Sequence, residues 1–132
     1  MCLLLRVQLE EPLGERTKDI SNIDGSLIVT ESRNWRKPTG LLTLSTEGGC
    51  ACSMLSDQAD RDDKYWDFLP ESLIALSITL EKIGDIFQQN FVFEALWIGD
   101  KPTVIIEISL CDMLKIIRNN RIGEKTRYLV HV

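Results

Sequence analysis

The sequence holds little of what catalytic and metal sites are usually built from. Among 132 residues there are one histidine and four cysteines, and 7% of the residues are aromatic. No apolar stretch approaches the roughly 18 residues that cross a bilayer, so we expect no membrane partner. Signatures of P-loop, dinucleotide-binding, zinc-protease, serine-hydrolase and kinase chains are all missing. Whether the chain is an enzyme stays open, with the balance toward a non-enzymatic protein.

Basic charge is also scarce, because 15 Lys and Arg stand against 20 Asp and Glu, a net charge of -5. Nucleic-acid binding depends largely on cations that neutralise phosphates, so we expect no nucleic-acid partner. The charge is unevenly spread, with acidic residues concentrated in 57–71 and basic residues in 115–127. An acidic end and a basic end can attract a second copy or a complementary protein. Two ordinary solvated faces would give the same pattern.

The length fits one domain, since a typical domain has roughly 150 residues. With 44% hydrophobic residues the chain can form a core. We therefore expect residues 1–132 to form a single α+β domain. The N-terminal segment resembles neither a signal peptide nor a lipidation site, which predicts a cytoplasmic location with reduced thiols.

Hydrophobic periodicity predicts the secondary structure. A helix is expected over 70–89, where Pro70 suits the first position, an apolar stripe recurs every three or four residues, and Gly84 marks a close packing contact. A second helix should follow Ser109, which can cap it. Period-two alternation and β-branched residues predict strands at 3–9, 26–30, 41–46, 91–98, 103–108 and 126–132.

The order of these segments predicts the fold class. Residues 91–98 and 103–108 flank the turn signal Gly99-Asp100 and should form a hairpin, whereas residues 31–40 are expected to be an exposed connection. Helices and strands do not alternate regularly, which favours an α+β fold over a doubly wound sheet. We expect a mainly antiparallel sheet with two helices on one face, and a ferredoxin-like arrangement of four strands is one option.

The sharpest local pattern is Cys50-Ala51-Cys52, which follows two glycines. Two thiolates at this spacing can point to a common centre, as a soft metal such as zinc requires, and nearby thiols can also serve a redox role. A structural zinc site needs four ligands, and no second paired motif completes this one. The alternative is two small buried side chains in a turn, because free cysteine is among the most buried residue types.

Residues 47–67 are expected to form a long loop, and such loops often carry function. Its other candidate functional residues are Ser53, Asp57, Asp60, Asp62, Asp63 and Trp66. The aspartates could bind a divalent cation, although their spacing is not that of an EF-hand, and solvated loop charge is the alternative. Trp66 is expected to attach the loop to the body of the protein.

Glu94 lies in an otherwise apolar predicted strand. If its face is buried, the carboxylate requires a positive partner, for which Arg121 and Arg127 are the candidates. If it lines a cleft, it could act as an acid. The simpler alternative, which we favour, is an exposed position at the edge of the sheet.

The sequence therefore predicts a non-enzymatic module that acts through protein contacts or self-association. The alternative is a thiol-redox or metal-binding protein that uses Cys50 and Cys52.

Overall fold

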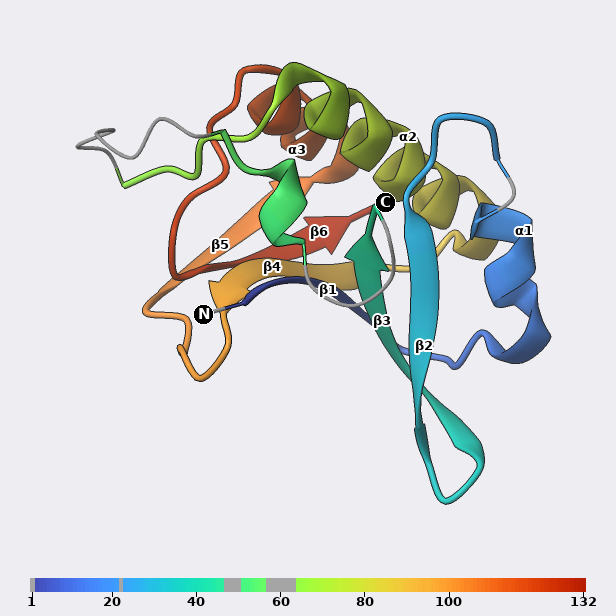
Figure 1. Cartoon of the computed structure of the whole chain (residues 1–132). Helices are drawn as coiled ribbons and strands as arrows, with labels where there is room; N and C mark the ends of the chain where they lie inside the picture. The colour runs from blue at the N-terminus through green and yellow to red at the C-terminus, as the bar shows by residue number, and fades with distance from the viewer. Residues whose placement is uncertain (1, 22, 47–50, 57–63) are drawn as a thin grey trace.

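The computed structural model describes residues 2–21, 23–46, 51–56 and 64–132, which build a sheet with helices on one side (Figure 1). The strands are β1 (Leu3–Leu9), β2 (Ile28–Asn34), β3 (Lys37–Ser45), β4 (Phe91–Trp97), β5 (Val104–Ser109) and β6 (Thr126–His131). The helices are α1 (Thr17–Ser21), α2 (Pro70–Phe87) and α3 (Leu110–Arg118), with short 3-10 turns η1 (Gly14–Arg16) and η2 (Cys52–Met54).

The strands lie in the order β2-β3-β1-β4-β6-β5. Neighbouring strands are antiparallel except β5 and β6, which are parallel and are joined through α3. A parallel neighbour requires a crossover connection, and α3 supplies it. The prediction of an α+β fold with a mostly antiparallel sheet is confirmed.

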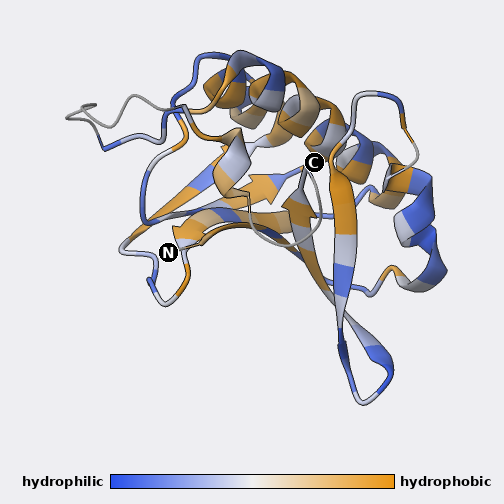
Figure 2. Cartoon of the chain, viewed as in Figure 1, coloured by the Kyte–Doolittle hydropathy of each residue, from blue (hydrophilic) through white to orange (hydrophobic). Residues whose placement is uncertain are grey.

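The core lies between the helices and one face of the sheet. Alternate residues of β1 (Leu3, Leu5 and Val7) are fully buried, and the α2 residues Leu76 and Leu80 are fully buried as well. Figure 2 shows the hydrophobic residues of the central strands beneath α2, whose outer surface is more polar. The period of two in β1 and the period near 3.6 in α2 thus place both apolar faces in one interior.

Three predictions of local structure are confirmed. The strand 3–9 is β1, Pro70 is the first residue of α2, and Ser109 caps α3 by accepting a hydrogen bond of 3.1 Å from the Asp112 N–H. These elements are encoded by short-range signals that need no knowledge of the tertiary fold. Among the described residues, no helix has the length and apolar character needed to span a bilayer.

The expectation of two helices is incomplete, because α1 is a third. Its five residues carry one buried apolar side chain, Ile20, so the sequence offers no periodic stripe to detect. α1 packs beside β2 and the C-terminal part of α2 (Figure 1). Packing against these neighbours supplies the stability that so short a helix lacks alone.

The predicted hairpin of 91–98 with 103–108 is wrong, because β6 lies between β4 and β5. β4 instead pairs with β6, and β5 pairs with the outer side of β6. Residues 31–40 are not a mere connection but most of the β2–β3 hairpin. The ferredoxin-like arrangement is not confirmed by this strand order.

Gly84 marks a close packing contact, as predicted, and the structure places this contact between α2 and α3. A Cβ atom built at Gly84 would stand 2.5 Å from Leu110 Cδ2, far inside van der Waals contact. The glycine therefore permits the two helices to approach.

Replacing Gly84 by Ala should lower the free energy of unfolding by up to about 2 kcal/mol, because displacing the Leu110 side chain costs about 1–3 kcal/mol and Ala regains roughly 1 kcal/mol in helix propensity. Urea denaturation measures the change. Leu110→Ala is the second variant of the pair. It should lower the free energy of unfolding by less in the Gly84→Ala background than in the wild type. A Gly84→Ala variant more stable than the wild type would contradict the close contact.

Candidate interaction surface

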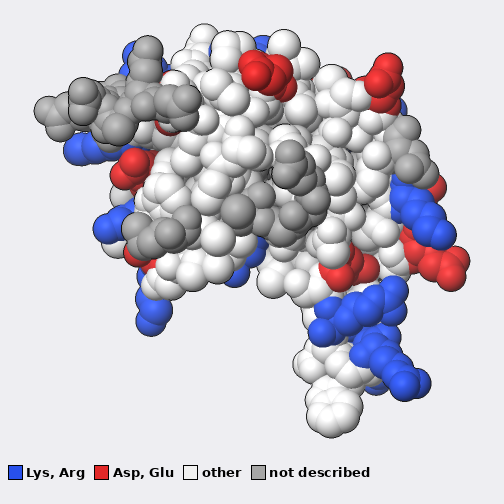
Figure 3. Space-filling view, in the orientation of Figure 1, with Lys and Arg blue, Asp and Glu red and all other residues white. Residues whose placement is uncertain are grey.

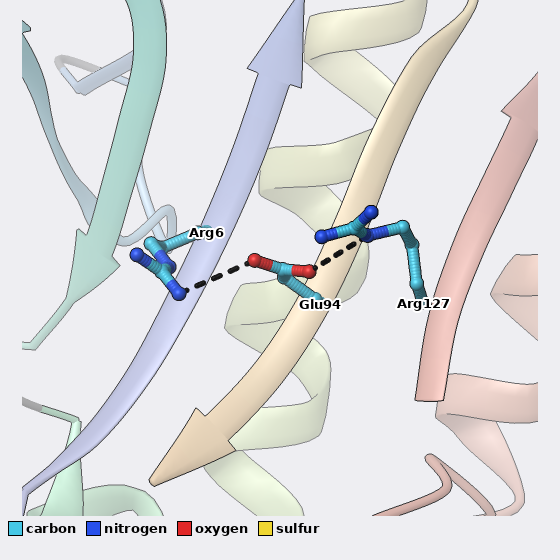
Figure 4. A network of polar contacts seen from close by, with 3 residues as sticks. All are labelled: Arg6, Glu94 and Arg127. Carbon is cyan, nitrogen blue, oxygen red and sulfur yellow. Dashed lines mark hydrogen bonds and ion pairs between the residues drawn. The ribbon is translucent and has the colours of Figure 1, made fainter. Parts of the chain in front are cut away.

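One face of the sheet is not covered by the helices, which lie on the other side (Figure 1). Alternate residues of the strands point to this open face, where three charged residues occupy neighbouring strands. Arg6 of β1 is directly opposite Glu94 of β4, and Glu94 is directly opposite Arg127 of β6. Figure 4 shows the three side chains pointing toward one another. The strand register therefore places a carboxylate between two guanidinium groups.

The Glu94 carboxylate is the centre of this cluster. Its Oε1 lies 3.3 Å from Arg6 Nη2, and its Oε2 accepts a hydrogen bond of 3.1 Å from Arg127 Nε. The Glu94 side chain is 12% exposed, whereas Arg6 and Arg127 are 31% and 41% exposed. The requirement that a poorly solvated carboxylate be paired is thus met by both oxygens. Arg127 was one of the two partners predicted from the sequence; Arg121 is not a partner, and Arg6 was missed.

The cluster borders a shallow hollow of about 470 Å³ in the open face. Its lining combines the three charged residues with Gln8, Leu41, Val92 and Leu129. Two cations against one anion leave a net positive charge, and Arg6 Nε is buried with no hydrogen-bond partner among the described residues. The hollow therefore combines apolar side chains with a carboxylate that both neighbouring arginines contact.

Replacing Glu94 by Leu should lower the free energy of unfolding by about 1–3 kcal/mol, because two cations would remain together without an anion. Partial exposure of both arginines keeps the loss below that of a fully buried pair. Urea denaturation measures it, with Arg127→Leu as the second variant. Arg127→Leu should lower the free energy of unfolding by less in the Glu94→Leu background than in the wild type. A Glu94→Leu variant as stable as the wild type would contradict the pairing.

β5 is an edge strand with apolar side chains exposed on both faces. Ile105, which lies on the open face, is 63% exposed, while Val104 and Ile106 on the helix side are 46% and 38% exposed. One backbone edge of β5 pairs with β6, and no other described strand pairs with its second edge. Natural sheets usually protect such an edge with charged residues, proline or a bulge. Within β5 the single charged residue is Glu107.

β2, at the opposite edge of the sheet, carries these protections. Its pairing with β3 shifts register between Glu31 and Arg33, which are both charged. The Glu31 carboxylate accepts hydrogen bonds of 2.7 Å from the N–H groups of Leu13 and Gly14, and one of 3.0 Å from Gly40. β2 is therefore bulged and fastened to the preceding segment, and β5 is the less protected of the two edges.

Cys52 lies against β1, and Cys50 falls outside the described residues. The Cys52 sulfur accepts a hydrogen bond from the Leu3 N–H at 3.2 Å, and Ala51 N–H donates to Leu3 O at 2.8 Å. Ala51 and Cys52 thus add two hydrogen bonds to β1, both at Leu3. The described residues contain no group of three His, Cys, Asp or Glu side chains suited to a metal. Zinc or redox use of the two cysteines stays a prediction.

The remaining loop candidates have separate positions. Asp57, Asp60, Asp62 and Asp63 lie outside the described residues. The Ser53 hydroxyl is hydrogen-bonded to that of Thr46 at 2.8 Å. Trp66 is 4% exposed, donates its indole N–H to Ala95 O at 3.0 Å, and packs edge-on against Trp97 at 5.0 Å between ring centroids. Trp66 attaches its segment to β4, as expected, and is a core residue rather than a surface ligand.

Tyr128 is the one described residue with a clearly shifted pKa. Burial raises the pKa of its phenol, and Tyr65 adds to the rise, while the hydrogen bond of 2.8 Å from the Gly123 N–H lowers it. The net effect is a raised pKa, so the phenol, which is already protonated at neutral pH, stays protonated further into the alkaline range. Its oxygen accepts the hydrogen bond from the backbone at Gly123.

Comparison with known proteins adds no relative from which a function could be transferred. No protein-family model, no curated protein and no solved structure matches the chain. Function is therefore inferred from the surfaces described above.

Proposed function

We propose that the protein is a non-enzymatic protein-interaction module that self-associates through the free edge of β5. The observation that carries this proposal is the exposure of three β-branched residues in one edge strand: Val104, Ile105 and Ile106. Pairing with another strand would satisfy the outward-facing backbone groups of β5 and remove apolar surface from water. A second copy supplies such a strand without any other partner.

The sequence of β5 favours an antiparallel pair about a twofold axis at Ile105. This register places Ile105 opposite its own copy and Val104 opposite Ile106 of the other copy. Glu107 then lies opposite Thr103, so the two glutamates are kept apart. Each apolar cross-strand pair contributes about 0.2–1 kcal/mol, and like charges directly opposite are unfavourable. A twofold contact of this kind is the commonest form of association between identical chains.

The open face supports an interaction module rather than an enzyme. Its charged residues Arg6, Glu94 and Arg127 are paired with one another across neighbouring strands, and both oxygens of the carboxylate are engaged. The thiol and zinc alternatives gain no support from the described residues, where the Cys52 sulfur already accepts a hydrogen bond. We further propose that the module acts in the cytoplasm on protein partners, and on neither nucleic acid nor membrane.

Ile105→Lys should raise the dissociation constant of the dimer by about tenfold or more, because the twofold axis brings two ammonium groups together. Sedimentation velocity over a concentration series measures the change. Mixing Ile105→Lys with Ile105→Glu should restore association, since the opposed residues would then carry opposite charges.

Ile28→Lys on β2 is the matched control, because it places the same charge on the other edge strand, and it should sediment like the wild type. A wild-type protein that stays monomeric at all concentrations would overturn the proposal. So would an Ile105→Lys variant that associates as the wild type does.

A further inference from the structure

The tip of the β2–β3 hairpin carries the most exposed large apolar side chain among those described. Trp35 is 93% exposed. Asn34 pairs with Lys37, so Trp35 and Arg36 form a two-residue turn, and both have positive φ, 52° and 69°. Turns of this kind favour Asn-Gly, because other side chains are strained at positive φ. The hairpin therefore holds an indole in water at two positions of positive φ that other residues would occupy with less strain.

Positive charge surrounds this indole. Arg36 adjoins Trp35 in the turn, and Arg33 and Lys37 lie on the two strands beside it. Arg33 Nη1 approaches the Arg36 carbonyl at 3.5 Å, so its guanidinium lies near the turn. In Figure 3 the hairpin projects from the body of the molecule, with basic side chains gathered behind its end. Trp and Arg are the residues that most often dominate binding energy at protein interfaces.

A groove of complementary chemistry lies along α2. It has a volume of about 490 Å³ and is lined by Pro70, Leu73, Ile74, Ser77, Ile78, Glu81 and Arg118. Ile74 is 63% exposed, so an apolar side chain of α2 faces water there. The Ser77 hydroxyl oxygen is buried and has no hydrogen-bond partner among the described residues. An indole would supply both apolar surface and an N–H donor for that oxygen.

The charge beside this groove is negative. Glu71, Ile74, Ile78, Glu81 and Asp85 follow one another at intervals of three and four residues, so they share one stripe of α2. The three acidic residues of the stripe are exposed. The α2 stripe therefore offers three carboxylates, and the hairpin offers three cations. Arg118, which also lines the groove, is positively charged, unlike the residues of the stripe. Its guanidinium can stack on an indole ring.

We propose that the hairpin tip of one copy binds the α2 groove of a second copy, with Trp35 in the groove and Arg33, Arg36 and Lys37 facing the acidic stripe. This inference rests on the proposed function only in taking a second copy as the partner, and it uses surfaces distinct from β5. Because the tip and the groove are different surfaces, the contact is head-to-tail and links copies into rings or chains. It adds to a β5 dimer rather than replacing it.

The two contacts differ in their response to salt. Attraction between the hairpin and the acidic stripe is screened as the ionic strength rises, since the Debye length falls from about 10 Å at 0.1 M to about 3 Å at 1 M. Pairing of β5 depends on backbone hydrogen bonds and apolar burial, which salt does not screen. Assembly beyond the dimer should therefore be weakened by salt, and the dimer should persist.

The first test is the double variant Trp35→Asn with Arg36→Gly, which gives the turn its preferred residues. The variant should unfold at a higher urea concentration than the wild type, because the strain at positive φ is relieved. It should nevertheless raise the dissociation constant of the salt-sensitive step by about tenfold or more in sedimentation velocity. A loss of assembly without loss of stability excludes misfolding as the cause. A variant that assembles as the wild type does would overturn the proposal.

The second test exchanges charges across the proposed contact. Arg36→Glu and Glu81→Arg should each weaken the salt-sensitive step, and an equimolar mixture of the two should restore association between them. Lys18→Glu is the control, since Lys18 is an exposed cation on α1, and it should behave as the wild type. No recovery in the mixture would overturn the pairing of tip and groove.

Other partners for the tip are excluded by titrating the wild-type protein with phosphatidylserine vesicles and with a single-stranded oligonucleotide. Because Trp66 and Trp97 also fluoresce, the Trp35 signal is the difference between the wild type and the Trp35→Asn/Arg36→Gly variant. The proposal expects neither probe to change this difference, whereas self-association does. Binding of either probe by a protein that shows no salt-sensitive assembly would overturn it. Failure of the β5 proposal is seen separately: Ile105→Lys would then sediment as the wild type, while Arg36→Glu still weakens assembly.

Discussion

The structure depends on the burial of the α2 apolar stripe against one face of the sheet. Leu76 and Leu80 of α2, together with Leu5 of β1 and Phe93 of β4, are fully buried in this layer. The helices of this chain cover one face of the sheet. The other face and the outermost strands therefore contact water or a partner. The surfaces proposed for interaction are those that this one-sided covering leaves exposed.

The uncovered regions of the sheet, which are its open face and its two edge strands, differ in how their charged groups and free backbone edges are protected. On the open face, Glu94 is neutralised by an arginine from each neighbouring strand, so charge is tolerated at the centre of the sheet. At the β2 edge, a register shift and the Glu31 hydrogen bonds protect the strand. At the β5 edge, Ile105 and its neighbours have no comparable protection. This contrast within one sheet is the basis for proposing β5 as the contact strand.

Local signals in the sequence predicted β1, α2, β4 and the cap of α3 because each depends on periodicity or on neighbouring residues. The partners of β5 could not be predicted, since strand order depends on contacts distant in sequence. Arg127 was foreseen as a partner of Glu94 from the cost of an unpaired carboxylate, whereas Arg6 needed the β1–β4 register. Trp35 was missed as a turn residue because the Asn-Gly signal of such turns is absent.

The most direct test of the central claim is hydrogen exchange of the β5 amides as the protein concentration rises. The account predicts that outward-facing amides of Val104–Ser109 exchange quickly in dilute protein and become protected at concentrations where dimers form. Amides of the central strand β1 should be equally protected throughout, because both of its edges are paired within the chain. If β5 exchanges at the same rate at every concentration while the protein nevertheless associates, its free edge is not the contact.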